Sequence, residues 1–331
     1  MKMFFAGIAA LAVFAPTQAQ DGTPLIYDDL NRFSEALDAI DGGMDPTLAF
    51  EAYLDAGSPA LDSYSERYDV SAESIAAAYE SRPAYYRAVA NLRPTLAEAE
   101  PDIQTAIGRL VQMTPTGMSV PVYFLVADQK AGGTPLLTQT DAGPRPVIAV
   151  ALDMLGLSPQ TDMSEFPTGT GGRAFVDDIP QVVVHEMAHI QQMRSQGGVE
   201  NYLSVYQPGQ GSMLAIAVRE GCAEYATLLV SGQRLGDRHV YGEAHEAELW
   251  AAFEPVMDDA QFSIPGWFGG THPDHPDWPP QIGYWLGAQM CEAFAVTGGD
   301  PDARLADMFT LYSPGQVHEI ADAYRNGLAN R

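Results

Sequence analysis

Cysteine is scarce in this chain of 331 residues, which contains only Cys222 and Cys291. Two cysteines are too few for a multiply bridged disulfide scaffold or for a cysteine-rich zinc cluster, so both classes are excluded. Each cysteine lies in an apolar pattern that is typical of a helix. Two interpretations remain open: a single Cys222–Cys291 bridge, which export would permit, and two buried thiols that act as small apolar side chains.

Basic residues are also few, because 17 lysines and arginines stand against 43 aspartates and glutamates. The formal net charge is −26 at pH 7. A field of that sign repels nucleic acid and anionic lipid surfaces, so neither is an expected partner. The apolar content of 46% and the charged content of 18% are typical of a folded globular chain rather than a disordered one.

Long apolar runs are missing except at the N-terminus, where one extends from Met3 to Pro16. Lys2 precedes this run, and Thr17-Gln18-Ala19 offers small residues at a cleavage site. This layout predicts a secretory signal peptide over residues 1–19. The alternative is a retained anchor, but a membrane span needs about 18 or more apolar residues and this run is shorter. We therefore expect a periplasmic or secreted protein with no stable membrane insertion after cleavage.

The hydrophobic pattern predicts a mostly helical α+β protein. Helical periodicity with Gly, Pro and Ser-led caps predicts a helical N-terminal layer over residues 20–115. β-Branched and aromatic residues then predict a small antiparallel sheet over residues 118–155, with strands at VPVYFLVAD (120–128) and RPVIAVALDML (145–155). The Gly/Pro-rich connection between these strands is interpreted as a loop around Gly132-Gly133-Thr134.

The remaining part, residues 178–331, is predicted to be helical again. Within it, the apolar segment 211–232 has Ser212 as a potential N-cap and Gly232 as its end. No linker is long enough to separate domains, so residues 20–331 are predicted to form a single domain.

The sequence His185-Glu186-Met187-Ala188-His189 predicts a zinc site. In a helix, residues four apart lie on one face, so both imidazoles can bind one ion at about 2.0–2.1 Å. Glu186 lies beside the first ligand, where its carboxylate can accept the proton of a metal-bound water. The alternative is a pair of exposed histidines on an amphipathic helix, but the preceding Val182-Val183-Val184 places this helix in a core.

A catalytic zinc ion takes three protein ligands and keeps one open position, so a third ligand is required. The extended motif HExxHxxGxxH would need glycine at position 192 and histidine at position 195. The chain has Gln192 and Ser195 there, which excludes that class.

Two acidic residues on a later helix offer the missing ligand. Glu220 and Glu224 are four apart and are the only acids of an otherwise apolar segment. Buried carboxylates are costly unless they are paired or bind metal, so we assign Glu220 as the third ligand. Glu224, one turn on, is expected to hydrogen-bond a ligating histidine. The alternative is an ion pair with Arg219 or a surface position.

An HExxH helix followed by Glu-xxx-Glu on a later helix resembles the gluzincin class, the thermolysin-like zinc peptidases, although the 30 residues between His189 and Glu220 exceed the usual spacing. A closer resemblance spans most of the chain. The segments RFSEALDAI, YLDAGSP, VYFLVAD with GGT, HEMAHIQQ, EGCAEY and GYWLGAQM occur in the same order in a family of predicted zinc-dependent proteases related to the gliding-motility protein GldB. This resemblance implies a gluzincin-like catalytic core and a metallopeptidase-like function, without a defined substrate.

A peptidase also needs a donor that stabilises the oxyanion of its tetrahedral intermediate. Tyr284 is the first candidate, because a phenol donates without carrying charge, and His245 is the second. An ordinary core position is the alternative for each. His272 and His275, in THPDHPDWPP, are interpreted either as exposed loop residues or as part of a second metal site.

The sequence thus predicts an exported zinc-dependent metallohydrolase that cleaves a peptide or protein substrate, with Glu186 as general base. The edge of the 120–128 strand is expected to pair with extended substrate. Two alternatives stay open: a non-catalytic zinc-binding envelope protein of the gliding-motility assembly type, and a hydrolase of other amides or peptidoglycan cross-links.

Overall fold

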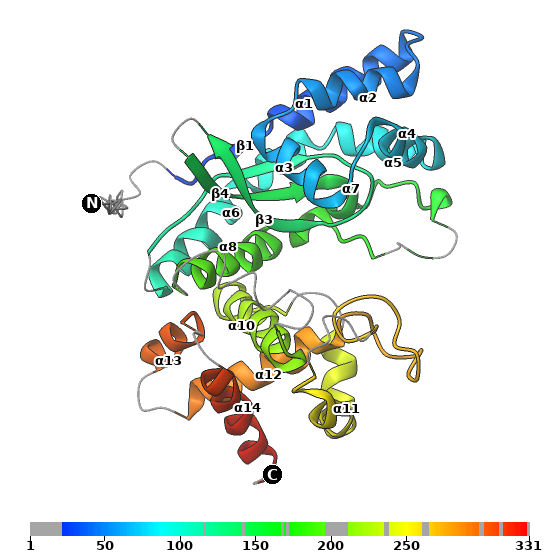
Figure 1. Cartoon of the computed structure of the whole chain (residues 1–331). Helices are drawn as coiled ribbons and strands as arrows, with labels where there is room; N and C mark the ends of the chain where they lie inside the picture. The colour runs from blue at the N-terminus through cyan, green and yellow to red at the C-terminus, as the bar shows by residue number, and fades with distance from the viewer. Residues whose placement is uncertain are drawn as a thin grey trace, which may run out of the picture.

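The computed structural model describes residues 22–114, 117–140, 143–166, 169, 172–195, 211–234, 238–259, 265–297, 301–310 and 314–329. Helices predominate over strands in this part of the chain, and the arrangement is α+β. Figure 1 shows the N-terminal helices and the sheet in one half of the molecule and the C-terminal helices in the other. The predicted signal peptide, residues 1–19, lies outside the described residues.

The predicted N-terminal helical layer is confirmed as six helices, α1 to α6: Asp28–Asp41, Pro46–Asp55, Pro59–Tyr68, Ala72–Ser81, Pro83–Ala90 and Arg93–Met113. Start signals in the sequence explain the short helices. Four of them begin with a proline in the first turn, where its missing N–H leaves no helical bond unmade. Ser71 and Ser74 form a capping box at the start of α4. Helices α1 and α3 pack against the strands.

A four-stranded sheet follows, with strands Leu25–Ile26 (β1), Val122–Leu125 (β2), Gly133–Thr140 (β3) and Gly143–Ala151 (β4). The strand order is β1-β2-β4-β3. β2 is parallel to both β1 and β4, whereas β3 is antiparallel to β4. The sheet is therefore mixed.

The prediction of an antiparallel sheet was wrong, and the reason lies in the segment interpreted as a loop. Thr134, Leu136 and Thr138 are buried while the residues between them are partly exposed, which is the alternation of a strand. This strand, β3, forms a hairpin with β4. The chain therefore reverses twice between the two expected strands, which leaves them parallel.

The C-terminal half consists of helices, as predicted. Their bounds are Ile179–Ser195 (α8), Met213–Ser231 (α10), Arg238–Phe253 (α11), Ile282–Val296 (α12), Pro301–Met308 (α13) and Pro314–Ala329 (α14), and 3-10 turns lie at Met163–Glu165, Val176–Asp178 and Glu254–Val256. The end of the predicted strand 145–155 is instead a short helix, Leu152–Leu155 (α7), which packs against β4 and α5 in the other half. Helix α8 contacts β3, β4 and α10, so it joins the two halves. Ser212 caps α10 and Gly232 ends it in the left-handed region, as expected.

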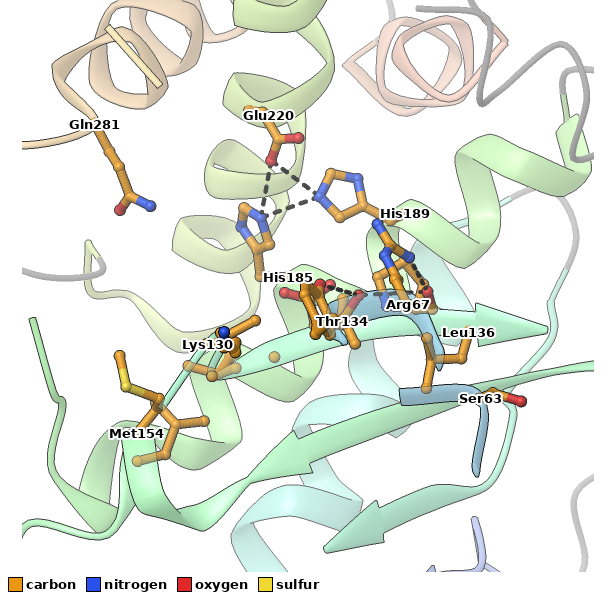
Figure 2. A pocket seen from close by; sticks show the side chains of 18 of the residues that line it. Ser63, Arg67, Lys130, Thr134, Leu136, Met154, His185, His189, Glu220 and Gln281 are labelled. Carbon is orange, nitrogen blue, oxygen red and sulfur yellow. Dashed lines mark hydrogen bonds and ion pairs between the residues drawn. The ribbon is translucent and has the colours of Figure 1, made fainter. Parts of the chain in front are cut away.

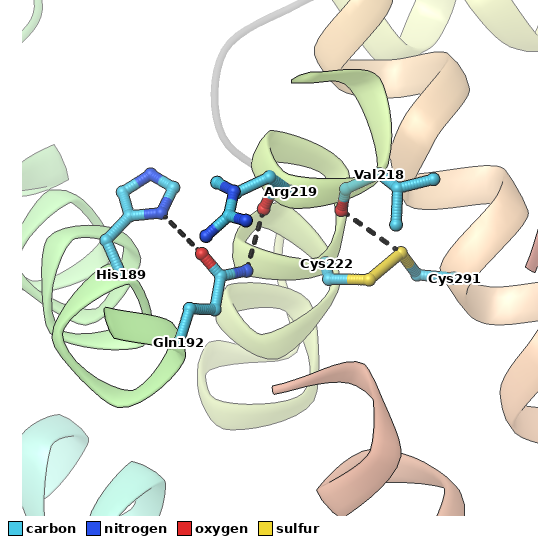
Figure 3. Close-up of a disulfide and its surroundings, with 6 residues drawn as sticks. All are labelled: His189, Gln192, Val218, Arg219, Cys222 and Cys291. Atoms are coloured by element: carbon cyan, nitrogen blue, oxygen red, sulfur yellow. Dashed lines mark hydrogen bonds between the residues drawn. A yellow bond between two sulfur atoms is a disulfide. The ribbon is translucent and has the colours of Figure 1, made fainter. Parts of the chain in front are cut away.

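Helices α10 and α12 cross with their backbones in contact. A Cβ on Gly221 would lie 2.0 Å from the carbonyl carbon of Gly287, and a Cβ on Gly287 would lie 1.8 Å from Ala217 O. One residue further along α10, Cys222 forms a disulfide with Cys291 of α12, which resolves the two interpretations of the cysteines (Figure 3). This close crossing fixes the position of the acidic face of α10 relative to α12.

Candidate metal centre

Two helices bring three ligand atoms together at the junction of the halves. His185 and His189 lie one turn apart on α8, and Glu220 faces them from α10 (Figure 2). The two Nε2 atoms are 3.1 Å apart, and they lie 3.3 Å (His185) and 3.1 Å (His189) from Glu220 Oε2. Ligands at about 2.0–2.1 Å from a tetrahedral zinc ion are separated by roughly 3.3–3.4 Å. The triangle therefore fits one face of such a coordination shell.

The three side chains are buried, and His189 and Glu220 stabilise each other's charged forms. Burial alone lowers the pKa of His189, but the charge and hydrogen bond of Glu220, the charge of Glu186 and the hydrogen bond of Gln192 together outweigh burial and raise that pKa to about 9. Burial likewise opposes ionisation of Glu220, yet the charges and hydrogen bonds of His189 and His185 together hold its pKa well below the usual range. A metal ion at this centre would replace the proton on His189 as the positive charge.

Gln192 orients His189, a role that the sequence did not suggest. Its Oε1 lies 2.8 Å from His189 Nδ1, and its amide nitrogen donates to the carbonyl oxygen of Arg219 at 2.9 Å (Figure 3). This arrangement places the ring proton on Nδ1 and leaves Nε2 free for a metal. The sequence feature that could have indicated this role is the position of Gln192 three residues after His189, one turn along the same helix face.

Glu224 lies beside His185 but not in the predicted contact. Its Oε1 is 3.7 Å from His185 Nδ1, which is beyond hydrogen-bond distance. The same oxygen instead forms a partly buried ion pair with Arg238 of α11. Glu224 thus contributes negative charge near the histidine, and Arg238 determines the direction of its carboxylate.

Glu186 occupies the position expected of a general base. It is buried beside the two histidines, and burial raises the pKa of its carboxyl. Gly133 of β3 packs directly against it: a Cβ at Gly133 would lie 2.9 Å from both Cγ and Oε1 of Glu186. The glycine is therefore required for the close approach of β3 to the base.

A cavity of about 950 Å³ opens onto these residues. Strand β3 and helix α3 form one wall, and α8, α10 and the start of α12 form the other (Figure 2). The three ligand residues, Glu186 and Glu224 all line it. A molecule of several residues can therefore reach the three ligand atoms.

Of the two predicted oxyanion donors, only Tyr284 lines the cavity. Its ring lies 6.0 Å from that of His185, and burial raises the pKa of its hydroxyl, so it stays protonated. His245 is placed elsewhere: it hydrogen-bonds Tyr241 O in its own helix and stacks on the Tyr241 ring. The structure therefore brings Tyr284, and not His245, to the ligand atoms.

The predicted second metal site and the predicted edge strand lie outside the group formed by His185, His189 and Glu220. His272 and His275 pack around Trp278, and burial lowers the pKa of His272. Within the described ranges, the single group of three residues able to hold a metal is His185, His189 and Glu220. β2, the expected edge strand, is internal, because β1 and β4 flank it; β3 forms the edge beside the cavity instead.

Comparison of the chain with protein-family models, with curated proteins and with solved structures finds no match. The resemblance to GldB-related proteases therefore stays a prediction. Among the described residues, no helix combines the length and the apolar character that a membrane span requires.

Proposed function

We propose that this protein is a zinc-dependent metallopeptidase of the gluzincin type. The observation that supports it most is the convergence of His185, His189 and Glu220 ligand atoms to within 3.3 Å of one another, next to Glu186 and open to a cavity. Two imidazole nitrogens and one carboxylate oxygen are a donor set that suits zinc. Zinc held there would supply a Lewis acid that activates water and polarises a carbonyl group.

The chain's own side chains would perform the proton transfers. Glu186 would accept the proton of the attacking water and pass it to the leaving amine, and its raised pKa suits both steps. The Tyr284 hydroxyl, kept neutral by burial, would donate a hydrogen bond to the developing oxyanion. The edge of β3 at Gly133, beside Glu186, would pair with the substrate backbone.

The open cavity favours catalysis over a purely structural zinc ion. Structural zinc sites are closed by four protein ligands. The group described here offers three, and they face the cavity. The non-catalytic envelope role is therefore the weaker proposal.

We further propose export to the periplasm or the medium. The N-terminal sequence has the layout of a signal peptide. The Cys222–Cys291 disulfide supports this, because such bonds persist in oxidising compartments.

The Glu186→Gln variant tests the peptidase proposal. Glutamine keeps the size of the side chain and lies outside the ligand set, so we expect unchanged zinc content and a loss of peptide hydrolysis of at least about 100-fold. Digestion of a denatured protein, followed by mass spectrometry, measures turnover, and metal analysis of the same samples measures zinc. Hydrolysis at the wild-type rate by the zinc-loaded variant would exclude Glu186 as the base.

A further inference from the structure

Helix α3 covers the outward edge of β3 at Pro135 and Leu137. Arg67 Nη1 donates to Pro135 O at 3.0 Å, and the hydroxyl of Ser63 donates to Leu137 O at 3.5 Å. Pro135 itself has no N–H to offer. Backbone groups of alternate residues in a strand face the same edge, so Gly133 is the first position at which a substrate backbone can pair. At the next two outward-facing positions, Pro135 and Leu137, α3 occupies the edge.

Arg67 lies at Pro135, the first position at which α3 occupies the edge of β3. It lines the cavity, and in the described part of the chain it forms no ion pair; its one hydrogen bond is to Pro135 O. A guanidinium group has five N–H donors arranged to bind a carboxylate, so most of its donor capacity remains for a ligand.

Three basic side chains line the cavity beside the four glutamates Glu66, Glu186, Glu220 and Glu224. Lys130, the only lysine besides Lys2, and Arg238 line it together with Arg67. Figure 2 shows Lys130 and Arg67 on opposite sides of Thr134. Arg238 is paired with Glu224, and Lys130 Nζ lies 3.6 Å from Asp128. Among the described residues, Arg67 is therefore the one of these three basic side chains that forms no ion pair.

We infer, on the basis of the proposed peptidase function, that the substrate is a peptide with a carboxylate about two residues beyond the scissile bond, and that Arg67 binds this carboxylate. Gly133 adjoins Glu186, where the scissile bond would lie. Pro135, where Arg67 is anchored, is two residues along the strand, roughly 7 Å away, and an extended peptide advances about 3.3–3.4 Å per residue.

The closed edge indicates which end of the peptide lies there. An N-terminal ammonium group would be repelled by Arg67, whereas a C-terminal carboxylate would be attracted. The carboxylate is therefore either the free C-terminus of the substrate or an acidic side chain close to that terminus. In the first case, the enzyme releases short C-terminal fragments.

Three N-acetylated peptides that share one neutral sequence apart from their C-terminal ends distinguish a free C-terminal carboxylate from an acidic side chain. The first has a free C-terminal carboxylate, the second a C-terminal amide, and the third the amide with glutamate as its last residue. The dissociation constant of each is measured with zinc-loaded Glu186→Gln protein, and kcat/KM with the wild type. We expect the first peptide, the third, or both to exceed the neutral amide by about tenfold in each measurement, since a hydrogen bond to a charged group is worth about that factor.

Arg67→Gln and Arg109→Gln form a matched pair. Arg109 also donates a single hydrogen bond to a backbone carbonyl, that of Val230 at 3.0 Å, but it does not line the cavity. Adding Arg67→Gln should reduce the preference for carboxylate to less than about twofold, and adding Arg109→Gln should retain it.

The outcomes distinguish this inference from the proposed function. Two results would overturn the inference even if peptides are cleaved. One is a preference for the carboxylate peptides that persists when Arg67→Gln is added. The other is equal binding of all three peptides by the protein that keeps Arg67. In a third result, the protein prefers the carboxylate peptides in binding, Arg67→Gln removes this preference, and the wild type cleaves no peptide. This result would support the carboxylate site and refute the proposed peptidase function.

Discussion

The imidazole of His189 is held from two sides. Nε2 faces Glu220 at 3.1 Å, and Nδ1 lies 2.8 Å from Gln192 Oε1. Gln192 is in turn fixed by the carbonyl oxygen of Arg219, on the helix that carries Glu220. The orientation of one ligand is therefore coupled to the helix that supplies another, as is usual for the partners of metal-binding histidines.

Replacement of Gln192 by alanine should weaken zinc binding by about 10- to 100-fold, because the ring of His189 loses its orienting partner. Gln191→Ala is the matched control. Gln191 is the adjacent residue, is equally buried, and donates its amide to Met118 O at 2.6 Å, away from the centre. Competition with a chelator of known affinity measures both variants, and equal zinc affinities for the two would contradict this role of Gln192.

The ligand residues could be predicted from the sequence because their spacing is local. Residues four apart on a helix lie on one face whatever surrounds them, so His185 with His189 and Glu220 with Glu224 followed from the helical pattern. The partner of Glu224 could not be predicted in this way. Arg238 lies on another helix, and only the tertiary packing of α11 brings it to Glu224.

At the scale of elements, helices were predicted better than strands for a physical reason. Helical caps and periodicity are local, as the α4 capping box illustrates. Strand pairing is not local, and β3 carries Gly133 and Pro135, which normally disfavour strands. Both are tolerated because β3 is an edge strand and because Glu186 occupies the space that a side chain at position 133 would fill.

Gly221→Ala should lower the free energy of unfolding by at least about 3 kcal/mol, because its methyl group would overlap the backbone of α12 at Gly287. Gly108→Ala makes the same change inside helix α6, where a Cβ would meet nothing within 4 Å. That control should be neutral or stabilising by up to about 1 kcal/mol. Urea unfolding of both variants, with the disulfide intact, compares them; losses of similar size would show that the helix crossing is not tight.

At the scale of the whole molecule, the sequence predicted the α+β class and the helical halves but not how they are joined. The loop from β2 to β3 illustrates the missing information. Tyr53, Tyr64 and Tyr86 of three different helices donate hydroxyl hydrogen bonds to its carbonyl oxygens at Val126, Ala131 and Ala127. These contacts join residues 41 to 73 positions apart, which no local pattern shows.

Asp153 anchors the same loop and should make stability depend on pH. Its two carboxylate oxygens accept from Ala127 N at 2.8 Å and Gln129 N at 2.6 Å. Burial nevertheless raises the pKa of Asp153 to about 6. Between the unfolded pKa near 3.9 and this folded value, the folded state binds the extra proton. Its contribution to stability is therefore greatest at low pH and is lost as pH rises through about 6.

The Asp153→Asn variant removes this titration and leaves all other ionisable groups common to both proteins. From pH 4 to pH 7, the free energy of unfolding of the wild type should fall relative to the variant by roughly 2 kcal/mol. Urea unfolding of the metal-free proteins at pH 4, 5, 6 and 7 measures the difference. Parallel pH profiles would show that Asp153 titrates alike in the folded and unfolded chains.

We predict that the centre between α8 and α10 binds zinc. Metal analysis of the purified wild type beside His189→Ala tests it most directly, with His245→Ala as a control for histidine loss outside the cavity. We predict about one zinc ion per chain in the wild type and in His245→Ala, and almost none in His189→Ala. Equal zinc content in the wild type and His189→Ala would contradict the account.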